Sequence, residues 1–253
     1  MSPANRTARA STRGTTRSPP TRGGHRCYGA APPGVHLKEL QGKLIVIEGQ
    51  DSSGRSTHVG LLSTWLQQEG YAVVEVGLKR SDLVGPELQQ AREGNTLSPR
   101  TMSLFYASDF YDQLENRIVP ALRAGAVVLA DRYIFTLMAR DLARGADLDW
   151  VKNLYSKAIV PDALFYLEAS PRTLLERRLE RHPGLDYWES GMDLGLSRDW
   201  YESFLLYQKR MANLFGKIIP EFGFEVVNAN RTVPTVNREL QARIGAFLKG
   251  WRT

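Results

Sequence analysis

The residues with the clearest capacity for chemistry form one glycine-bounded run in the first quarter of the chain. Its spacing fits GxxxxGK[ST], the pattern in which loop amides and a helix N-terminus hold the phosphates of a nucleotide. One position differs, because Arg55 stands where the pattern has lysine. The pattern predicts phosphate contacts from the whole run, Gly49, Gln50, Asp51, Ser52, Ser53, Gly54, Arg55, Ser56 and Thr57.

Separate parts of this loop have separate physical tasks. Gly49 and Gly54 allow backbone angles that turn amide N–H groups toward one point. The Ser56 hydroxyl is a ligand for Mg²⁺, and a long cation such as Arg55 reaches the β- and γ-phosphates. Arginine keeps the charge of lysine, but its planar fork needs more room. Two alternatives stay open: a loop that binds a nucleotide but transfers phosphate poorly, and a turn without a ligand.

These residues need a scaffold, and the chain alternates strand-like and helix-like segments, which predicts crossover units and a parallel sheet. Apolar helical spacing follows the loop over residues 56–69, and a long helix is expected from Pro99 to Ala124. Ser98, Ser170 and Ser197 are the expected caps of three helices. The expected strands are residues 44–48, 72–76, 126–130, 163–167 and 224–227.

Composition narrows the class of protein. The 253 residues are 42% hydrophobic and 24% charged, which is typical of a soluble globular protein. No apolar run approaches the roughly 20 residues that span a bilayer, so no membrane partner is expected. The single cysteine, Cys27, excludes an internal disulfide and fits a reducing, cytoplasmic location.

The formal charge of +6 comes from residues 1–36, which hold six arginines and no acid. Removing these 6 from 33 basic residues leaves 27 basic against 27 acidic, so a nucleic-acid partner is unlikely for residues 37–253. The composition of 1–36 predicts a disordered basic tail. A transit peptide, a basic arm for nucleic acid and a dispensable upstream extension stay open. We favour the extension, because the tail lacks an apolar helical face.

Several segments resemble the thymidylate kinase family, in order and at the spacing of that family, over about residues 42–250. The resemblance implies a P-loop α/β fold in residues 37–253, with a five-stranded parallel sheet, helices on both faces and a lid at about 182–196. It also implies transfer of the γ-phosphoryl group of ATP, with Mg²⁺, to a nucleoside monophosphate. The segments are Ile47-Glu48-Gly49-x-Asp51, Leu104-Phe105-Tyr106-Ala107, Ile118-Val119-Pro120-Ala121-Leu122, Asp131-Arg132-Tyr133, and Pro161-Asp162 leading into Phe165-Tyr166-Leu167 and Ser170-Pro171.

The resemblance assigns roles at matching positions. Asp51 matches an aspartate near the acceptor sugar, and Asp131 an acid near Mg²⁺. Arg132 matches the arginine that holds the acceptor phosphate, with an ion pair to Asp131 as the alternative. Phe105 matches the aromatic that stacks on the base, unless it is a core residue. Thr136 matches a family serine, and Lys79 or Arg80 could replace a family arginine.

Four positions depart from the family: Arg55, Asp109, the pair Arg140-Asp141, and Tyr187 in the lid. Asp109 replaces an arginine that addresses the base. A carboxylate cannot donate to O4 of thymine, so Asp109 and Asp141 suggest an acceptor base with an exocyclic amine. The alternative is that Asp109 pairs with an arginine such as Arg140, and the base is recognised elsewhere.

A transition-state cation is expected from the lid, because the loop offers only Ser52 and Ser53 at the positions where some family members place one. The helix entering the lid carries Arg177, Arg178 and Arg181, of which Arg178 and Arg181 join Arg55 and Arg132 as catalytic candidates. A solvated face paired with Glu176 and Glu180 is the alternative.

The sequence therefore predicts an ATP- and Mg²⁺-dependent nucleoside monophosphate kinase with dTMP as the default acceptor and a possible homodimer through residues 99–124. Two rival classes stay open. One is a catalytically impaired nucleotide-binding relative, and the other is a protein whose role lies in its basic tail.

Overall fold

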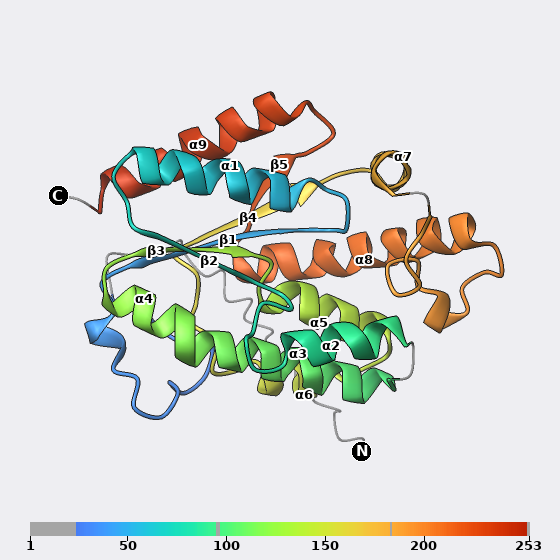
Figure 1. Ribbon diagram of the computed structural model, residues 1–253, viewed down its shortest axis with the longest axis horizontal. Coiled ribbons are helices and arrows are strands. Elements are labelled where there is room, and N and C mark those ends of the chain that lie inside the picture. Colours follow the sequence, from blue (N-terminus) through green and yellow to red (C-terminus); the bar gives the residue numbers. More distant parts are fainter. Residues whose placement is uncertain (1–23, 95–96, 183, 252–253) are drawn as a thin grey trace, which may run out of the picture.

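The computed structural model describes residues 24–94, 97–182 and 184–251, and its centre is a five-stranded parallel sheet in the order β2-β3-β1-β4-β5 (Figure 1). The sheet confirms the expected strand positions and fold class. Its strands are β1 (Lys43–Gly49), β2 (Val73–Gly77), β3 (Val127–Asp131), β4 (Ala163–Glu168) and β5 (Glu225–Asn228).

The central strand, β1, pairs with β3 and β4, with Ile47 opposite Asp131 and Phe165. Helices cover both faces of the sheet, so β1 is an unbroken run of buried side chains after Lys43. Because parallel strands end at one edge, the loops after β1, β2, β3 and β4 meet there. That edge contains every loop that the sequence marked for chemistry.

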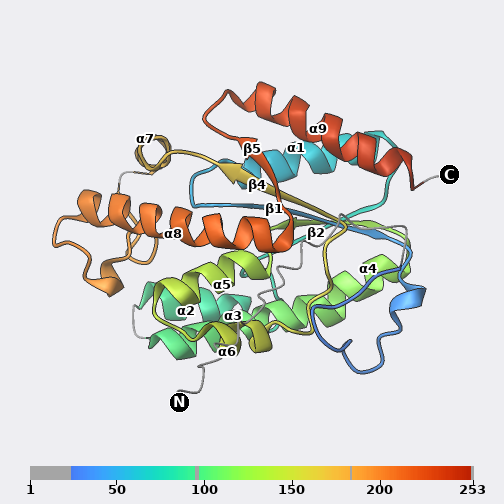
Figure 2. The same ribbon diagram turned by 180° about the vertical axis from the view of Figure 1, so that it is seen from behind.

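The helices form two layers around the sheet (Figures 1 and 2). On one face α1 and α9 pack through Val59, Leu62 and Leu66 against Leu240 and Ile244. The other face has a larger core beneath α3, α4, α5 and α8. The helices are α1 (Arg55–Gln68), α2 (Gly85–Glu93), α3 (Pro99–Gln113), α4 (Val119–Arg123), α5 (Ile134–Ala143), α6 (Leu148–Leu154), α7 (Pro171–Arg181), α8 (Trp200–Phe222) and α9 (Val233–Lys249).

The long helix expected from Pro99 to Ala124 is present, but one wide turn at Leu114–Ile118 separates α3 from α4. Pro120 lies just beyond this turn and cannot donate to a carbonyl one turn earlier, so the standard ladder is interrupted there.

Two of the three expected helix caps are confirmed. Ser98 accepts from the Thr101 amide and Ser170 from the Thr173 amide. The expected cap at Ser197 is wrong, because Asp199 accepts from the Glu202 amide at 2.8 Å and begins α8. Ser197 and Asp199 are both residue types that cap helices, and the Asp199 carboxylate is the one that caps α8.

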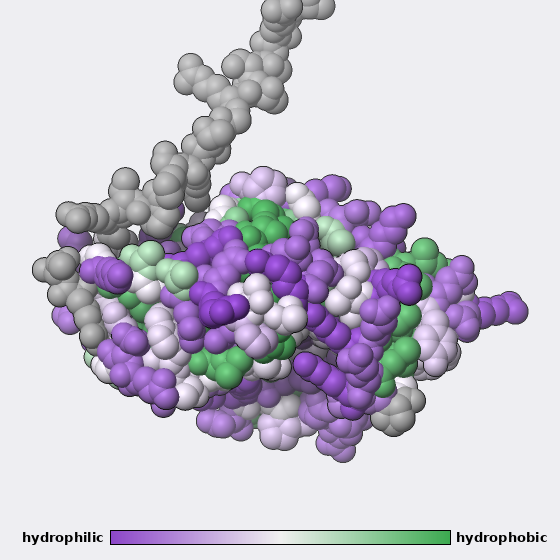
Figure 3. Space-filling view, turned by 90° about the horizontal axis from the view of Figure 1, so that it is seen from above, coloured by the Kyte–Doolittle hydropathy of each residue, from purple (hydrophilic) through white to green (hydrophobic). Residues whose placement is uncertain are grey.

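The surface over α9 is mostly hydrophilic, with separate apolar areas (Figure 3). Among the described residues, no helix is long and apolar enough to cross a membrane.

The segment of residues 24–36 is not a disordered tail, and the expected boundary at 36 is wrong for it. Cys27 pairs with Ile159 in an isolated antiparallel β-bridge of the backbone, and the Tyr28 amide donates to the carbonyl of Ala158 at 3.1 Å. The Tyr28 ring lies edge-on to Phe135 and Phe222. The average composition of the tail concealed these few apolar residues. The rest of the predicted tail, residues 1–23, lies outside the described residues, and the three interpretations of its role stay open.

Tyr28→Ala is therefore expected to lower the free energy of unfolding by about 1–3 kcal/mol, because it removes a ring that packs against two core aromatics. Denaturant unfolding of the full chain measures this change. Tyr201→Ala, at a half-exposed tyrosine of α8, is the matched control. An unchanged midpoint for Tyr28→Ala would show that the segment contributes nothing to stability.

Candidate active site

The predicted phosphate loop leaves β1 at Gly49 and enters α1 at Arg55, which is the strand–loop–helix placement that the pattern requires. Gly49 has a φ of +154° and Gly54 one of +94°. A Cβ at Gly49 would lie 2.7 Å from Ser53 Oγ and 2.9 Å from the carbonyl oxygen of Leu167. Glycine is therefore required at this turn by both angle and space.

Arg55 is buried, and its guanidinium holds the loop together. Its Nε donates to Asp131 Oδ1 at 3.1 Å, while Nη1 donates to the carbonyl oxygens of Gly49 and Gln50. A planar guanidinium can donate hydrogen bonds to a carboxylate and to two carbonyl oxygens that lie in different directions, whereas the donors of a lysine ammonium all sit on one nitrogen. The arginine thus connects the loop to the end of β3.

Ser56 and Asp131 lie together at the start of α1. The Ser56 hydroxyl donates to Asp131 Oδ2 at 2.6 Å. Burial alone would raise the pKa of Asp131, but Arg55 and the Ser56 hydrogen bond hold it below its usual value. A hydroxyl and an ionised carboxylate fit Mg²⁺, which takes few protein oxygens when phosphates supply the rest. Among the described residues, no group of three or more His, Cys, Asp and Glu could hold a metal.

A second charged cluster lies beside the loop. Asp51 forms ion pairs with Arg132 and, at 3.1 Å, with Arg140. Burial would raise the pKa of Asp51, but these arginines hold it well below its usual range. The alternative pairing of Arg132 with Asp131 is wrong. Arg132 has a φ of +71°, a conformation disfavoured for a residue with a side chain.

Glu48, for which the sequence predicts no role of its own, holds this strained turn. Its fully buried carboxylate accepts from the amide of Tyr133 at 2.8 Å, and from the amide and hydroxyl of Thr136. Thr136 therefore contacts Glu48 at the start of α5. A buried acid that ends a strand is the signal that could have identified Glu48.

Asp109 holds the segment after β2. Its two oxygens accept from the backbone amides of Lys79 and Ser81 at 2.7 and 2.9 Å. The alternative pairing of Asp109 with Arg140 is wrong, since Arg140 pairs with Asp51. Lys79 has a φ of +63°, and burial with Arg92, Arg140 and Arg132 lowers its pKa to about 8. Arg80 instead pairs with Glu75 and lies 3.9 Å from Asp131.

The lid arginines point in different directions. Arg178 Nε lies 3.7 Å from Glu189 in the lid, and Arg177 donates to backbone carbonyls of Ser53 and Ala229. Arg181 is exposed at the end of α7. Of the two catalytic candidates on α7, Arg178 and Arg181, the described contacts bring only Arg178 to the lid.

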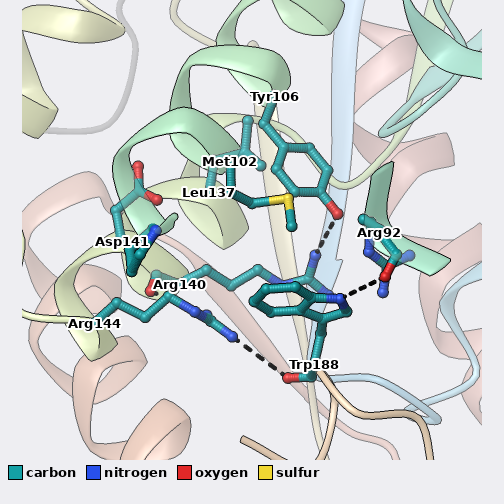
Figure 4. Close-up of a pocket in the computed structure, with 9 residues that line it drawn as sticks. Arg92, Met102, Tyr106, Leu137, Arg140, Asp141, Arg144 and Trp188 are labelled. Carbon is teal, nitrogen blue, oxygen red and sulfur yellow. Dashed lines mark hydrogen bonds between the residues drawn. The ribbon is translucent and has the colours of Figure 1, made fainter. Parts of the chain in front are cut away.

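A small pocket lies beyond Arg140, between α3, α5 and the lid (Figure 4). Tyr106 lines it, whereas Phe105 is half-buried against the larger core. Asp141 accepts from the Ser103 hydroxyl at 2.6 Å, and burial raises its pKa to about 6. The Trp188 indole closes the pocket by donating to the carbonyl of Arg92 at 2.9 Å. The lining residues are Arg92, Pro99, Met102, Tyr106, Leu137, Arg140, Asp141, Arg144 and Trp188.

A strand–loop–helix phosphate seat beside a pocket rich in arginine defines a P-loop protein that is suited to phosphoryl transfer between nucleotides. The family model described as thymidylate kinase matches residues 47–211. The chain belongs to the thymidylate kinase family and is an ATP-dependent nucleoside monophosphate kinase.

Several relatives carry the same family name. The chain is 35% identical to "Probable thymidylate kinase 2" of Saccharolobus solfataricus, over 83% of this chain and 98% of that protein. It is 30% identical to "Probable thymidylate kinase" of Thermococcus kodakarensis, over 81% and 98% respectively. It is also 33% identical to "Thymidylate kinase" of Caldanaerobacter subterraneus, over 58% and 76%.

Arg55→Lys is expected to weaken ATP binding about tenfold or more, because an ammonium cannot hold Asp131 and both loop carbonyls together. Calorimetric titration with Mg-ATP measures this, and Arg243→Lys on α9 is the control. Equal or tighter binding would show that the loop works as a standard lysine loop.

Asp141→Asn is expected to raise the free energy of unfolding, relative to the wild type, by more at high pH than at low pH. Because the folded pKa is about 6 and the unfolded value is near 3.9, the folded wild type binds the proton more tightly. Wild-type stability therefore falls between about pH 4 and pH 6, by up to about 3 kcal/mol. Because asparagine does not titrate, the stability of the variant lacks this contribution to the pH dependence.

Unfolding at pH 4.5 and pH 7.5 measures this difference for Asp141→Asn. Asp149→Asn, at an exposed site on α6, is its control. A gain that is the same at both values of pH would contradict the buried titration.

Proposed function

We propose that this kinase transfers the γ-phosphoryl group of Mg-ATP to dTMP or a closely related deoxynucleoside monophosphate. The observation that carries the proposal is the pair of adjacent charged sites, one at the phosphate loop and one around Asp51, Arg132 and Arg140. The names of the relatives favour dTMP as the acceptor.

On the donor side, residues 49–57 would surround the triphosphate, with Arg55 bracing the loop. Ser56 and Asp131 would hold Mg²⁺, whose charge when bound offsets that of the phosphates. The amides at the start of α1 point toward this seat and favour an anion there.

On the acceptor side, Arg132 and Arg140 would hold the monophosphate, and Asp51 keeps both guanidinium groups in place. Lys79 adds a cation whose pKa is lowered to about 8, first by burial and then by the neighbouring arginines. The acceptor phosphate is already an anionic nucleophile, so no general base is needed. Catalysis then depends on positioning and on charge stabilisation, with Arg178 as the lid candidate closest to this cluster.

The family resemblance also implies a homodimer through α3. Leu104, which is 49% exposed on that helix, is consistent with such a face. The dimer stays a prediction.

The test is ADP release from Mg-ATP by the full chain, across the common ribo- and deoxyribonucleoside monophosphates. We expect the highest kcat/KM with dTMP, and at least a tenfold loss in Asp131→Asn, because that change leaves Arg55 and Ser56 without their ionised partner. Asp149→Asn is the control. ATP binding without turnover for any acceptor would support the catalytically impaired alternative and overturn this proposal.

A further inference from the structure

The pocket beneath Trp188 lies next to the acceptor phosphate cluster, and Arg140 belongs to both. Arg140 Nη2 is 3.1 Å from Asp51, while its Nη1 donates to the Tyr106 hydroxyl in the pocket wall at 3.4 Å. Figure 4 shows the Arg140 side chain extending past the Trp188 indole toward the Tyr106 hydroxyl. A nucleotide whose phosphate meets Arg132 and Arg140 would therefore place its base in this pocket.

Three guanidinium groups line the pocket, and they differ in how strongly they are engaged. Arg140 is paired with Asp51, and Arg144 forms a bidentate pair with Asp193 at 2.7 and 3.1 Å. Arg92, on α2, is 8% exposed, and its pair with Asp186 is long, at 3.4 Å. That pair uses one of the five donors of a guanidinium. Arg92 is thus the cation best able to take a new acceptor.

Tyr106, Met102, Leu137 and Trp188 give the remaining wall an aromatic and apolar character suited to the faces of a planar ring. A guanidinium donates hydrogen bonds and accepts none. A base edge with a carbonyl oxygen satisfies Arg92, whereas an exocyclic amine would set donor against donor.

We propose that Arg92 reads the acceptor base in the pocket beneath Trp188, and that the pocket selects bases with a carbonyl at the edge facing Arg92. This inference rests on the proposed function and deepens it. It reverses the expectation drawn from Asp109 and Asp141 of an amine-bearing base, because Asp109 holds backbone amides and Arg92 brings a donor to the pocket. Asp141 also lines the pocket, where its Oδ1 accepts from the Ser103 hydroxyl and its Oδ2 is buried without a hydrogen-bond partner. Arg92 supplies from α2 the donor that α3 lacks at position 109.

The pocket must open for a base to enter. Its cavity is about 20 Å³, room for about one water molecule. Trp188 is the part of the wall contributed by the lid, held by the Arg92 carbonyl and by Arg144, which lies 5.7 Å from its ring. Trp188 therefore lifts and closes again over the bound base, which changes the surroundings of its indole.

The experiment compares dUMP with dCMP, which differ along one edge of the ring: dUMP has a carbonyl at C4 beside an N3–H donor, and dCMP has an amine at C4 beside an N3 acceptor. For the wild type we expect kcat/KM to favour dUMP by at least tenfold. Arg92→Met should lower kcat/KM for dUMP at least tenfold and bring the ratio close to one. Titration with dUMP should change tryptophan fluorescence in the wild type, and Trp188→Phe should remove most of that change.

Two controls separate base reading from support of the lid. Asp186→Asn removes the lid partner of Arg92 but keeps the guanidinium, so the dUMP preference should persist. Arg123→Met, at an exposed arginine that ends α4, should leave both values unchanged. A wild-type preference for dCMP, or an equal loss for both acceptors in Arg92→Met, would overturn the inference while the kinase assignment stands. Absence of turnover with every acceptor would overturn the proposed function itself.

Discussion

A buried guanidinium connects the two strand ends from which this active site is built. β1 and β3 are parallel neighbours, and Arg55 spans from the loop after β1 to Asp131 at the end of β3. A desolvated charge needs a partner at short range, and loss of one partner of such a pair typically costs about 3–5 kcal/mol. The shape of the phosphate loop and the ionisation of the candidate Mg²⁺ ligand therefore depend on one contact. The arginine is part of the architecture of the loop, besides the charge that we propose it offers to the phosphates.

The sequence predicted the sheet well because each strand is a short apolar run between turn residues, and because the phosphate loop fixes a strand before it and a helix after it. The resemblance placed Asp51 and Arg132 at the acceptor site, but the only partner that the sequence suggested for Arg140 was Asp109, whereas Arg140 pairs with Asp51. It could not show which side of α3 faces the pocket, since Leu104, Phe105 and Tyr106 are consecutive and all apolar or aromatic. It could not show the task of Asp109, because the partners of its carboxylate lie about 30 residues earlier in the chain. Arg92 lies on a short helix with little apolar pattern, so only the fold reveals its burial.

A polar chain connects the donor loop with the lid. Buried Gln50 donates to Gln208 of α8, and Gln208 donates to the carbonyl of Glu189 at 3.0 Å. Next to it, Ser203 donates to the carbonyl of Ser190 at 2.8 Å. The backbone of the lid is therefore hydrogen-bonded to α8, the same helix that contacts the phosphate loop through Gln208. The movement that we propose for Trp188 would therefore act on α8, the helix that also contacts the phosphate loop.

The two described ends of the chain lie at the edge of the sheet opposite the active site. His25 hydrogen-bonds to the carbonyl of Gly42, just before β1, and the indole of Trp251 donates to the carbonyl of Gln41. The described part of the chain therefore begins and ends on the side of the sheet away from the phosphate loop. Its first and last described contacts hold the start of β1, so they brace the central strand at the end opposite the loop that Arg55 braces.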